Sequence, residues 1–523
     1  MFHKIVKTLI TRSLFFLIVF CCCLSCKTDL RQVSPDLYFK TIRDGSILWN
    51  SVNIELGVPN SGSLSKVDIL VNSKVQFTLT QTPFRTDWNT LDLEDGEYEV
   101  KAVSTDKDGN QRTAKVTVVI QNTLLSFTVP NNHLRSANGQ MEKGWVFISS
   151  TSGELLALSE FKNGEKIKLI NHGYNEKTFM VSETYLNSGV ILDISSFLDV
   201  GRGHWTLAKV EESPPVVGRL SINFKDSVGV HPYYVSTSGD ARKFYEGGNS
   251  IKLNLTQSPS RLFIRELGKD FNHYNLIEGL TFNNPYTGLF AELNNPLQSF
   301  ITPDIPGAET VGVRLYGFPN ASSFSEFYQL GVFVLNQGKV KIEYPGLAFP
   351  AYGSETFYRG NNIRINSFHP TKMYDATPLT AQVIFKDVGN TTATLATFGN
   401  FDVYLIGWGH VDKESELSWV LTGGQGKSEY LKLPELPPTI RSAASVNFNT
   451  KNLQFFNVVQ LADYEISSGY QSYIQYISAN GYNAPYTFGK GWKEQTFGKD
   501  GITGGGRKNA DEVPTIKERL SRR

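Results

Sequence analysis

Cysteine is missing from almost the whole sequence. The 523 residues contain four cysteines, and all four lie between Cys21 and Cys26. If the chain is cleaved ahead of Cys26, the mature protein has no disulfide, no thiol nucleophile and no cysteine-ligated zinc. Its stability must then come from hydrophobic cores, and at about 100–200 residues per domain the chain has room for several.

The sequence also lacks an excess of positive or of negative charge. The 51 Lys and Arg residues balance the 50 Asp and Glu residues, which leaves a formal net charge of +1. Proteins that bind nucleic acids concentrate Lys and Arg to displace counterions, so we expect no nucleic-acid partner. Aromatic residues make up 12% of the chain and 45 residues are glycine. This composition favours β-strands joined by turns.

Local catalytic motifs are also missing. The eight histidines form no His-Glu-x-x-His pair, and no Gly-x-Ser-x-Gly elbow is present. The run TGGQGKS (Thr422–Ser428) resembles a phosphate-binding loop, but Leu421 stands where that motif needs glycine, so we expect a hairpin turn there. We expect no metal and no cofactor. Two carboxylates on distant strands would still suffice for a glycosidase, so catalysis is disfavoured and not excluded.

The N-terminus has the pattern of a secretory signal. Basic residues precede an apolar run over 14–20, which is shorter than the roughly 20 residues of a membrane-spanning helix. Leu24-Ser25-Cys26 resembles a bacterial lipobox, with Cys23 in place of the usual leucine. We predict that residues 1–25 are a lipoprotein signal peptide, that Cys26 is the lipidated residue, and that 26–33 link it to the first domain. The alternative is an ordinary signal peptide.

The two residues Lys27 and Asp29 resemble a weak form of the signal that sends Bacteroidetes-type lipoproteins to the outer face of the outer membrane. The resemblance implies an outer-membrane lipoprotein that faces the cell surface. Its membrane partner would be held through acyl chains, each buried CH₂ contributing roughly 0.8 kcal/mol. A periplasmic orientation is the alternative.

From residue 34 to residue 122, apolar and polar residues alternate as they do in strands with one buried face. The stretches TPFRTDWNT (Thr82–Thr90) and DGEYEVKAVSTD (Asp95–Asp106) resemble bacterial Ig-like domains of extracellular proteins. The resemblance implies a β-sandwich used as a spacer or adhesive module. Trp88 is expected in its core and Tyr98 at a tyrosine corner.

The remainder of the chain resembles itself. STSGELLALSEFKNGEKIKLIN (Ser150–Asn171) matches STSGDARKFYEGGNSIKLN (Ser236–Asn254), and each ends in an Ile-Lys-Leu strand. GSETFYRGNNIRIN (Gly353–Asn366) is a candidate third copy. A second shared element joins INFKDSVG (Ile222–Gly229) to VIFKDVGN (Val383–Asn390). Uneven spacing favours related β-sandwich domains over a solenoid. Chance similarity among strands is the alternative.

These patterns predict an all-β chain of tandem Ig-like β-sandwiches with a mobile C-terminal tail. Proline pairs at 213–218 and 436–441 are expected to be linkers, because proline cannot donate to a strand ladder. The predicted domains are 34–122 (Ig-like), 125–212 (sandwich repeat 1), 216–305 (sandwich repeat 2), 306–436 (β-rich, candidate third repeat), 437–488 (β-rich C-terminal segment) and 489–523 (flexible tail).

Aromatic residues beside glycines are the candidate ligand-binding residues, because a glycine neighbour can leave a ring face uncovered for stacking. We expect a non-catalytic surface lipoprotein that binds a glycan or a protein. A glycan-degrading hydrolase or lyase on an Ig-like stalk is one alternative, and a structural spacer of an envelope complex is another. The candidates are Trp205, Tyr233, Tyr234, Trp408 and Trp492, and a place in the core is the competing interpretation of each.

Overall fold

Strands account for nearly all regular structure in the computed structural model, which confirms the all-β prediction. The chain divides into two compact units, 1–122 (unit 1) and 123–523 (unit 2). Cys26, the signal peptide and the chain beyond Gly498 lie outside the described residues. The structure describes residues 37–498 except 59–63, 135–140, 188–189, 208–214, 226–232, 239, 245–249, 268–272, 290–291, 303–308, 336–338, 340, 347, 361–362, 372–376, 412–415, 427–428, 444–449, 482–484 and 486–488.

Unit 1 is an Ig-like β-sandwich with a core of its own. Trp88 is 4% exposed in that core, as predicted. The Tyr98 hydroxyl donates to the Glu94 carbonyl at 3.0 Å, which confirms the tyrosine corner. One sheet has the order β1-β3-β6 and the other β2-β8-β7-β4-β5. The strands are β1 (Tyr38–Phe39), β2 (Ile47–Leu48), β3 (Ser51–Gly57), β4 (Leu64–Val71), β5 (Lys74–Leu79), β6 (Arg85–Asn89), β7 (Gly96–Asp106) and β8 (Gln111–Ile120).

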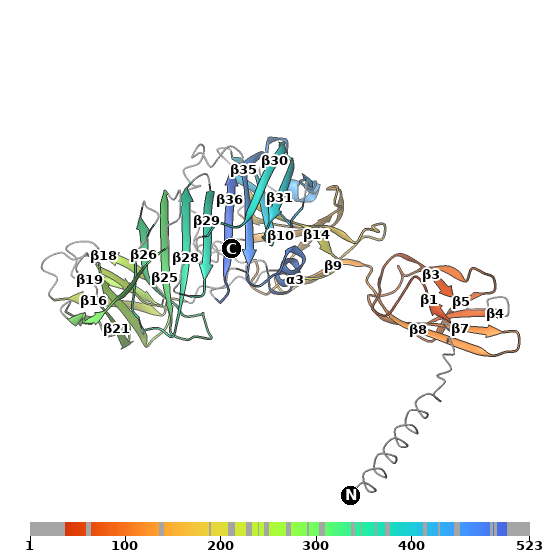
Figure 1. Ribbon diagram of the computed structural model, residues 1–523, viewed down its shortest axis with the longest axis horizontal. Helices are drawn as coiled ribbons and strands as arrows, with labels where there is room; N and C mark the ends of the chain where they lie inside the picture. The colour runs from red at the N-terminus through yellow and green to blue at the C-terminus, as the bar shows by residue number, and fades with distance from the viewer. Residues whose placement is uncertain are drawn as a thin grey trace, which may run out of the picture. The chain divides into compact units, whose positions relative to one another are not determined.

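Unit 2 contains four β-sandwiches, numbered in chain order (Figure 1). Sandwich 1 consists of β9 (Thr123–Thr128), β10 (Met141–Ser149), β11 (Leu155–Phe161), β12 (Lys166–Ile170), β13 (Thr178–Asn187), β14 (Val190–Gly201) and β15 (Gly203–Thr206). Sandwich 2 consists of β16 (Gly218–Phe224), β17 (Tyr233–Ser236), β18 (Ala241–Phe244), β19 (Ser250–Leu255), β20 (Ser260–Glu266), β21 (His273–Leu280), β22 (Tyr286–Gly288) and β23 (Asn295–Pro296).

Sandwich 3 consists of β24 (Gln298–Ile301), β25 (Thr310–Phe318), β26 (Tyr328–Leu335), β27 (Lys341–Tyr344), β28 (Ala351–Gly360) and β29 (Ile363–His369). Sandwich 4 consists of β30 (Ala381–Val388), β31 (Thr392–Gly399), β32 (Val403–Val411), β33 (Glu416–Gly423), β34 (Glu429–Lys432), β35 (Gln454–Tyr464) and β36 (Trp492–Gly498), with α2 (Pro438–Ala443), η3 (Thr450–Asn452) and α3 (Tyr470–Asn480).

All four sandwiches use one strand order. The third, second, fifth and sixth strands form one sheet, as in β11-β10-β13-β14 and β18-β17-β20-β21. The fourth and first strands pair on the other side, as in β12-β9 and β19-β16. Sandwich 3 repeats this order with β26-β25-β28-β29 and β27-β24. Sandwich 4 repeats it with β33-β32-β35-β36 and β34-β31 when its strands are counted from β31, because β30 is an additional edge strand. The similarity detected in the sequence therefore reflects a repeated topology.

The two Ile-Lys-Leu segments occupy the same place in their sandwiches, as the sequence predicted. Leu169 on β12 lies opposite Leu125 on β9, and Leu253 on β19 lies opposite Leu220 on β16. All four leucines are buried. Burial of each stabilises its sandwich by roughly 1.5–3 kcal/mol.

The candidate third copy is aligned differently from the prediction. Ile363–His369 is β29, the sixth strand of its sandwich, whereas the Ile-Lys-Leu segments are fourth strands. The fourth strand of sandwich 3 is β27, where Ile342 is buried. The second shared element also differs, because β16 is the middle strand of its sheet and β30 is an edge strand.

Two expected boundaries fall inside sandwich 4. The proline pair near residue 436 is no linker, since Leu436 and Ile440 are 3% and 0% exposed in the core. The expected tail from residue 489 begins with β36, which pairs with both β29 and β35, and its Trp492 is buried. The range 306–436 thus contributes strands to sandwiches 3 and 4.

The sandwiches of unit 2 are fused to one another. A 12-stranded sheet joins the four-stranded sheets of sandwiches 1, 4 and 3 through the pairs β14-β33 and β36-β29. Trp145 and Phe147 of sandwich 1 lie in one core with Trp408 and Trp419 of sandwich 4. Phe263 of sandwich 2 lies in the core of sandwich 3. Hydrophobic cores therefore cross from one sandwich to the next.

Candidate functional site

The five aromatic residues proposed as ligand contacts are buried, so the exposure on which that prediction rested is wrong. Trp205 packs on Phe197, and Tyr233 packs on Phe224. Four of the five rings lie in sandwich cores, on the inward side of their strands: Trp205, Tyr233, Trp408 and Trp492. Tyr234 points to the face opposite to that of Tyr233, where Gln329 Nε2 of sandwich 3 donates to its hydroxyl at 2.5 Å. Trp205, Tyr233, Tyr234, Trp408 and Trp492 have exposed fractions of 1%, 4%, 5%, 0% and 3%.

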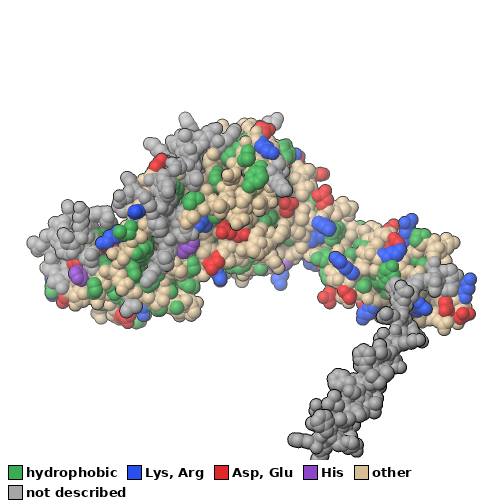
Figure 2. All heavy atoms as spheres, viewed as in Figure 1, with side chains coloured by type: hydrophobic (Ala, Val, Ile, Leu, Met, Phe, Trp, Pro, Cys, Tyr) green, Lys and Arg blue, Asp and Glu red, His purple; other side chains and the backbone are tan. Residues whose placement is uncertain are grey.

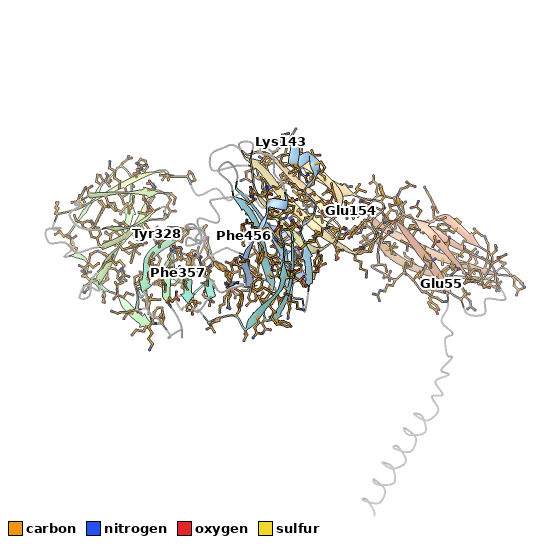
Figure 3. All side chains as sticks on the ribbon, turned by 90° about the horizontal axis from the view of Figure 1, so that it is seen from above. Glu55, Lys143, Glu154, Tyr328, Phe357 and Phe456 are labelled. Atoms are coloured by element: carbon orange, nitrogen blue, oxygen red, sulfur yellow. The ribbon has the colours of Figure 1, made fainter. Side chains whose placement is uncertain are left out.

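Trp408 shows why flanking glycines misled the prediction. Successive residues of a strand point to opposite faces of the sheet. Trp408 therefore points inward, where its indole N–H donates to the Gly389 carbonyl at 3.1 Å. Gly407 and Gly409 face the other side, against the ring of Phe456, which Figure 3 labels. A Cβ on Gly407 would lie 2.6 Å from Phe456 Cδ2. These glycines make room for a neighbouring ring on the opposite face.

The outward residues of the fourth strand differ in type between the four sandwiches. In each sandwich an outward residue of the fourth strand lies directly across from a hydroxyl residue of the first strand. The pairs are Lys168 and Ser126 in sandwich 1, Lys252 and Ser221 in sandwich 2, Glu343 and Ser299 in sandwich 3, and Tyr430 and Thr394 in sandwich 4. The fourth strands β12, β19 and β27 have no outward Phe, Tyr or Trp, whereas β34 has Tyr430 beside Lys432, which lies opposite Thr392.

Tyr430 belongs to the outward face of the β30-β31-β34 sheet, which we call the aromatic face. Tyr430, Ile384 and Phe398 are 69%, 49% and 39% exposed. The register sets Ile384 opposite Ala396 and Gln382 opposite Phe398, on the same side as Thr394. Figure 2 shows hydrophobic side chains open to solvent over β30 and β31. The aromatic face consists of the outward residues Gln382, Ile384, Thr394, Ala396, Phe398, Tyr430 and Lys432.

The opposite side of this sheet is anchored in the core. Ala393, Leu395 and Leu431 are at most 5% exposed and pack in the core that sandwiches 1 and 4 share. A sheet with one face buried in this way holds the residues of its other face in fixed register. At about 3.4 Å per residue along a strand, Tyr430 and Phe398 lie about 14 Å apart. The aromatic face is therefore broad and preorganised.

A carboxyl group with shifted acidity lies on the inward side of β34. Burial raises the pKa of the Glu429 carboxyl, and the charge of Asp199 raises it further, while a hydrogen bond from Tyr404 opposes the shift. The Tyr404 hydroxyl donates to Glu429 Oε2 at 2.5 Å. Three nearby glycines pack against Tyr404, Tyr470 and Glu429, where added Cβ atoms would clash; they are Gly423, Gly424 and Gly426.

Sites for metals and membrane spans are absent from the part of the chain that is described. Among those residues, no group of three or more His, Cys, Asp and Glu side chains is placed to hold a metal ion. No helix in the same part is long and apolar enough to cross a membrane. The Asp106–Asn110 segment is the hairpin turn between β7 and β8, and Asp106 Oδ1 accepts hydrogen bonds from the backbone N–H groups of Asp108 and Asn110.

The aromatic face was missed by the sequence analysis, although one signal for it was present. In EYLKL (Glu429–Leu433) the alternation sets Leu431 and Leu433 inward, and both are buried. Tyr430 between Glu429 and Leu431 must then point outward. For Ile384 and Phe398 no comparable signal exists, because inward Phe385 and Val383 are equally apolar.

No curated protein matches the chain. Among solved structures, SGBP-B of a Bacteroides ovatus mixed-linkage glucan utilisation locus has 9% identity and a TM-score of 0.16, and the match covers 62% of this chain and 98% of that one. Fibronectin(III)-like modules of Clostridium thermocellum CbhA have 17% identity and a TM-score of 0.15, covering 16% and 94%. With TM-scores this low, neither the architecture nor the function of these proteins is inferred for this chain. Residues 40–102 match the bacterial Ig domain family, so unit 1 contains a bacterial Ig-like domain.

Proposed function

We propose that this chain is a non-catalytic binding protein, lipid-anchored through Cys26 at the cell surface, that holds a glycan or protein ligand on the aromatic face. The observation that carries the proposal is the internal comparison. Three sandwiches of the same topology fold with no outward Phe, Tyr or Trp on the fourth strand, whereas the fourth strand of sandwich 4 exposes Tyr430. The fold therefore does not require an exposed ring there, and its presence supports a binding role.

The chemistry of the aromatic face favours a glycan. The Tyr430 ring is open to stacking, while the Thr394 hydroxyl and the Gln382 amide lie on the same side of the sheet. An apolar ring with a few convergent polar groups suits a sugar, which has apolar ring faces and hydroxyl edges. A stacked ring contributes on the order of 1 kcal/mol beyond the area it buries, about a fivefold change in affinity.

Binding without turnover is supported by the surroundings of Glu429. A general acid must lie within hydrogen-bond reach of its substrate. Glu429 Oε2 accepts from Tyr404, and Oε1 abuts the backbone of Gly426. The carboxyl is thus held by the protein itself. Unit 1 would act as the stalk between the lipid and unit 2.

The function is tested by probing an array of immobilised polysaccharides with the full chain while assaying the release of reducing ends. We expect binding to at least one polysaccharide without release. Tyr430→Ser should weaken that binding about fivefold. The matched control is Ile301→Ser, which removes a 67%-exposed side chain from the corresponding sheet of sandwich 3. Cleavage of a polysaccharide, or binding that is indifferent to Tyr430→Ser, would contradict the proposal.

The anchor is tested separately. Cys26→Ala should abolish acyl labelling and release the protein from membranes, because one acylated cysteine would hold the whole chain. Normal labelling in Cys26→Ala with loss in Cys23→Ala would show that the lipid is on another cysteine.

A further inference from the structure

Two other surfaces of unit 2 differ from the aromatic face in charge. These are the outward faces of the sheets β12-β9-β15 in sandwich 1 and β19-β16-β22 in sandwich 2. The six strands contain no Asp or Glu, although Asp and Glu nearly equal Lys and Arg over the whole chain. We call them the basic faces. Acidic residues are thus missing from the strands of both faces.

On the first basic face, cations and hydroxyls lie in two cross-strand rows. Lys168, Ser126 and His204 form one row, and Lys166, Thr128 and Thr206 form the other. Neither lysine has a carboxylate within 4.0 Å among the described residues. His204 is exposed, with Nδ1 3.0 Å from Ser126 Oγ and Nε2 3.2 Å from Thr128 Oγ1.

The second basic face repeats this chemistry. Lys252 lies opposite Ser221, and Arg219 lies opposite Asn254, with Arg219 Nε donating to Asn254 Oδ1 at 3.2 Å. Asn223 lies opposite Thr287 on β22, and both side chains point outward. At its edge the backbone N–H of Asn254 donates to Asp240 Oδ2 at 3.4 Å, so one acidic residue lies at the rim of this face.

Of the four described sheets at this position in unit 2, those of sandwiches 1 and 2 thus share a cationic, hydroxyl-bearing surface. Sandwich 3 departs from it, because its Glu343 pairs with Arg265 at 2.6 Å. Sandwich 4 departs through Tyr430. Charge segregation of this kind creates a local positive potential on a nearly neutral chain, which attracts anions.

The arrangement points to the kind of anion. Lys166 and Lys168 lie about 7 Å apart along one strand, which suits charges that repeat along a polymer. The hydroxyls between the cations offer hydrogen bonds to sugar hydroxyls. The outward residues include no Phe, Tyr or Trp, whereas single-stranded nucleic acid is ordinarily bound by stacking on such rings.

We propose that the two basic faces bind a polyanionic polysaccharide, one bearing sulfate or carboxylate groups, at sites separate from the aromatic face. Lys168 and Lys252 are the equivalent central cations of the two sites. Each contact is exposed and therefore weak, and binding falls as salt screens it. Because both sites lie on unit 2, one long polysaccharide can bind at both of them, which raises the overall affinity.

The test measures binding of the full chain to heparin and to polygalacturonate, with dextran as the uncharged control, at low and at physiological salt. Lys168→Gln and Lys252→Gln should each weaken binding about threefold, and the double variant about tenfold. The matched control is Lys74→Gln, which removes an exposed lysine from edge strand β5 of unit 1. It should leave binding unchanged.

Several outcomes would overturn the proposal. These are a double variant that binds both polymers as tightly as the unchanged chain, an equal loss in Lys74→Gln, or equal binding to dextran. Phosphatidylglycerol vesicles and a DNA duplex serve as competing anions. If either binds with the lysine dependence expected of the polysaccharides while the polysaccharides do not bind, the faces recognise a membrane or nucleic acid instead. Tyr430→Ser separates this proposal from the first, because it should leave heparin binding unchanged.

Discussion

Unit 1 and unit 2 are built from sandwiches of the same general kind, yet they close their cores differently. In unit 1 the side chains that pack around Trp88 all come from that one sandwich. In unit 2 the core around Trp408 includes Trp145 from a sandwich more than 200 residues earlier in the chain. The difference shows that a tandem array in sequence need not be a string of independent domains. Unit 1 is separable, whereas the four sandwiches of unit 2 should fold and unfold together.

Fusion has a functional consequence for the aromatic face. The β30-β31-β34 sheet packs on a core to which sandwich 1 contributes, and β14 pairs with β33 over Asp193–Phe197. The face is held by two sandwiches at once. A rigid platform loses less entropy on binding than a mobile one, so shallow contacts can still give measurable affinity.

The largest difference between the two units is expected from the substitution Trp408→Ala. This side chain is fully buried and packs on Phe455 in the shared core. Its removal should lower the free energy of unfolding of unit 2 by about 4 kcal/mol and leave the transition of unit 1 unchanged. Denaturant unfolding followed by tryptophan fluorescence measures both. A new third transition, confined to sandwich 4, would mean that the sandwiches are independent.

A smaller effect is expected from Glu343→Gln, which leaves the buried Arg265 guanidinium without its charged partner. Arg265 joins β20 of sandwich 2 to β27 of sandwich 3, and its side chain is 3% exposed. We expect unit 2 to lose about 2 kcal/mol, at the low end for breaking a buried pair because glutamine can still accept a hydrogen bond. Glu55→Gln is the matched control. It breaks the exposed Lys40–Glu55 pair of unit 1, which has the same kind of contact at 2.7 Å, and should change stability little.

The smallest stability effect is expected in unit 1. Tyr98→Phe removes only the hydrogen bond from the tyrosine hydroxyl to the Glu94 carbonyl. The loss should be about 1 kcal/mol, the usual net value of one hydrogen bond. It should appear as an earlier unit 1 transition in thermal unfolding, with the unit 2 transition at its original temperature. A shift of both transitions would show that the units are coupled.

Local patterns were sufficient to predict the elements but not their assembly. Trp88, Tyr98 and the strands around Leu169 and Leu253 follow from alternation and from the resemblance to Ig-like domains. The pairing of β14 with β33 follows from neither, because period two sets which residues point inward and not which distant edge completes the sheet. The boundary near residue 436 was missed for the same reason.

The candidate site was less predictable than the fold. Glycine beside an aromatic residue was taken to mark an open ring, but adjacent strand residues lie on opposite faces. At Trp408 the open space is therefore on the far side, under Phe456. Tyr430 could have been found by alternation with Leu431. Its significance could not, because only the aligned sandwiches show that the other three fourth strands have no outward aromatic residue.

The most direct test of the account is to delete residues 34–122 and measure polysaccharide binding by the remaining chain. Unit 2 has its own cores and carries the aromatic face, so the shortened chain should bind with the affinity of the full chain and should still lose about fivefold on Tyr430→Ser. Loss of binding in a shortened chain that still unfolds in one cooperative transition would place the ligand site on unit 1 and contradict the account.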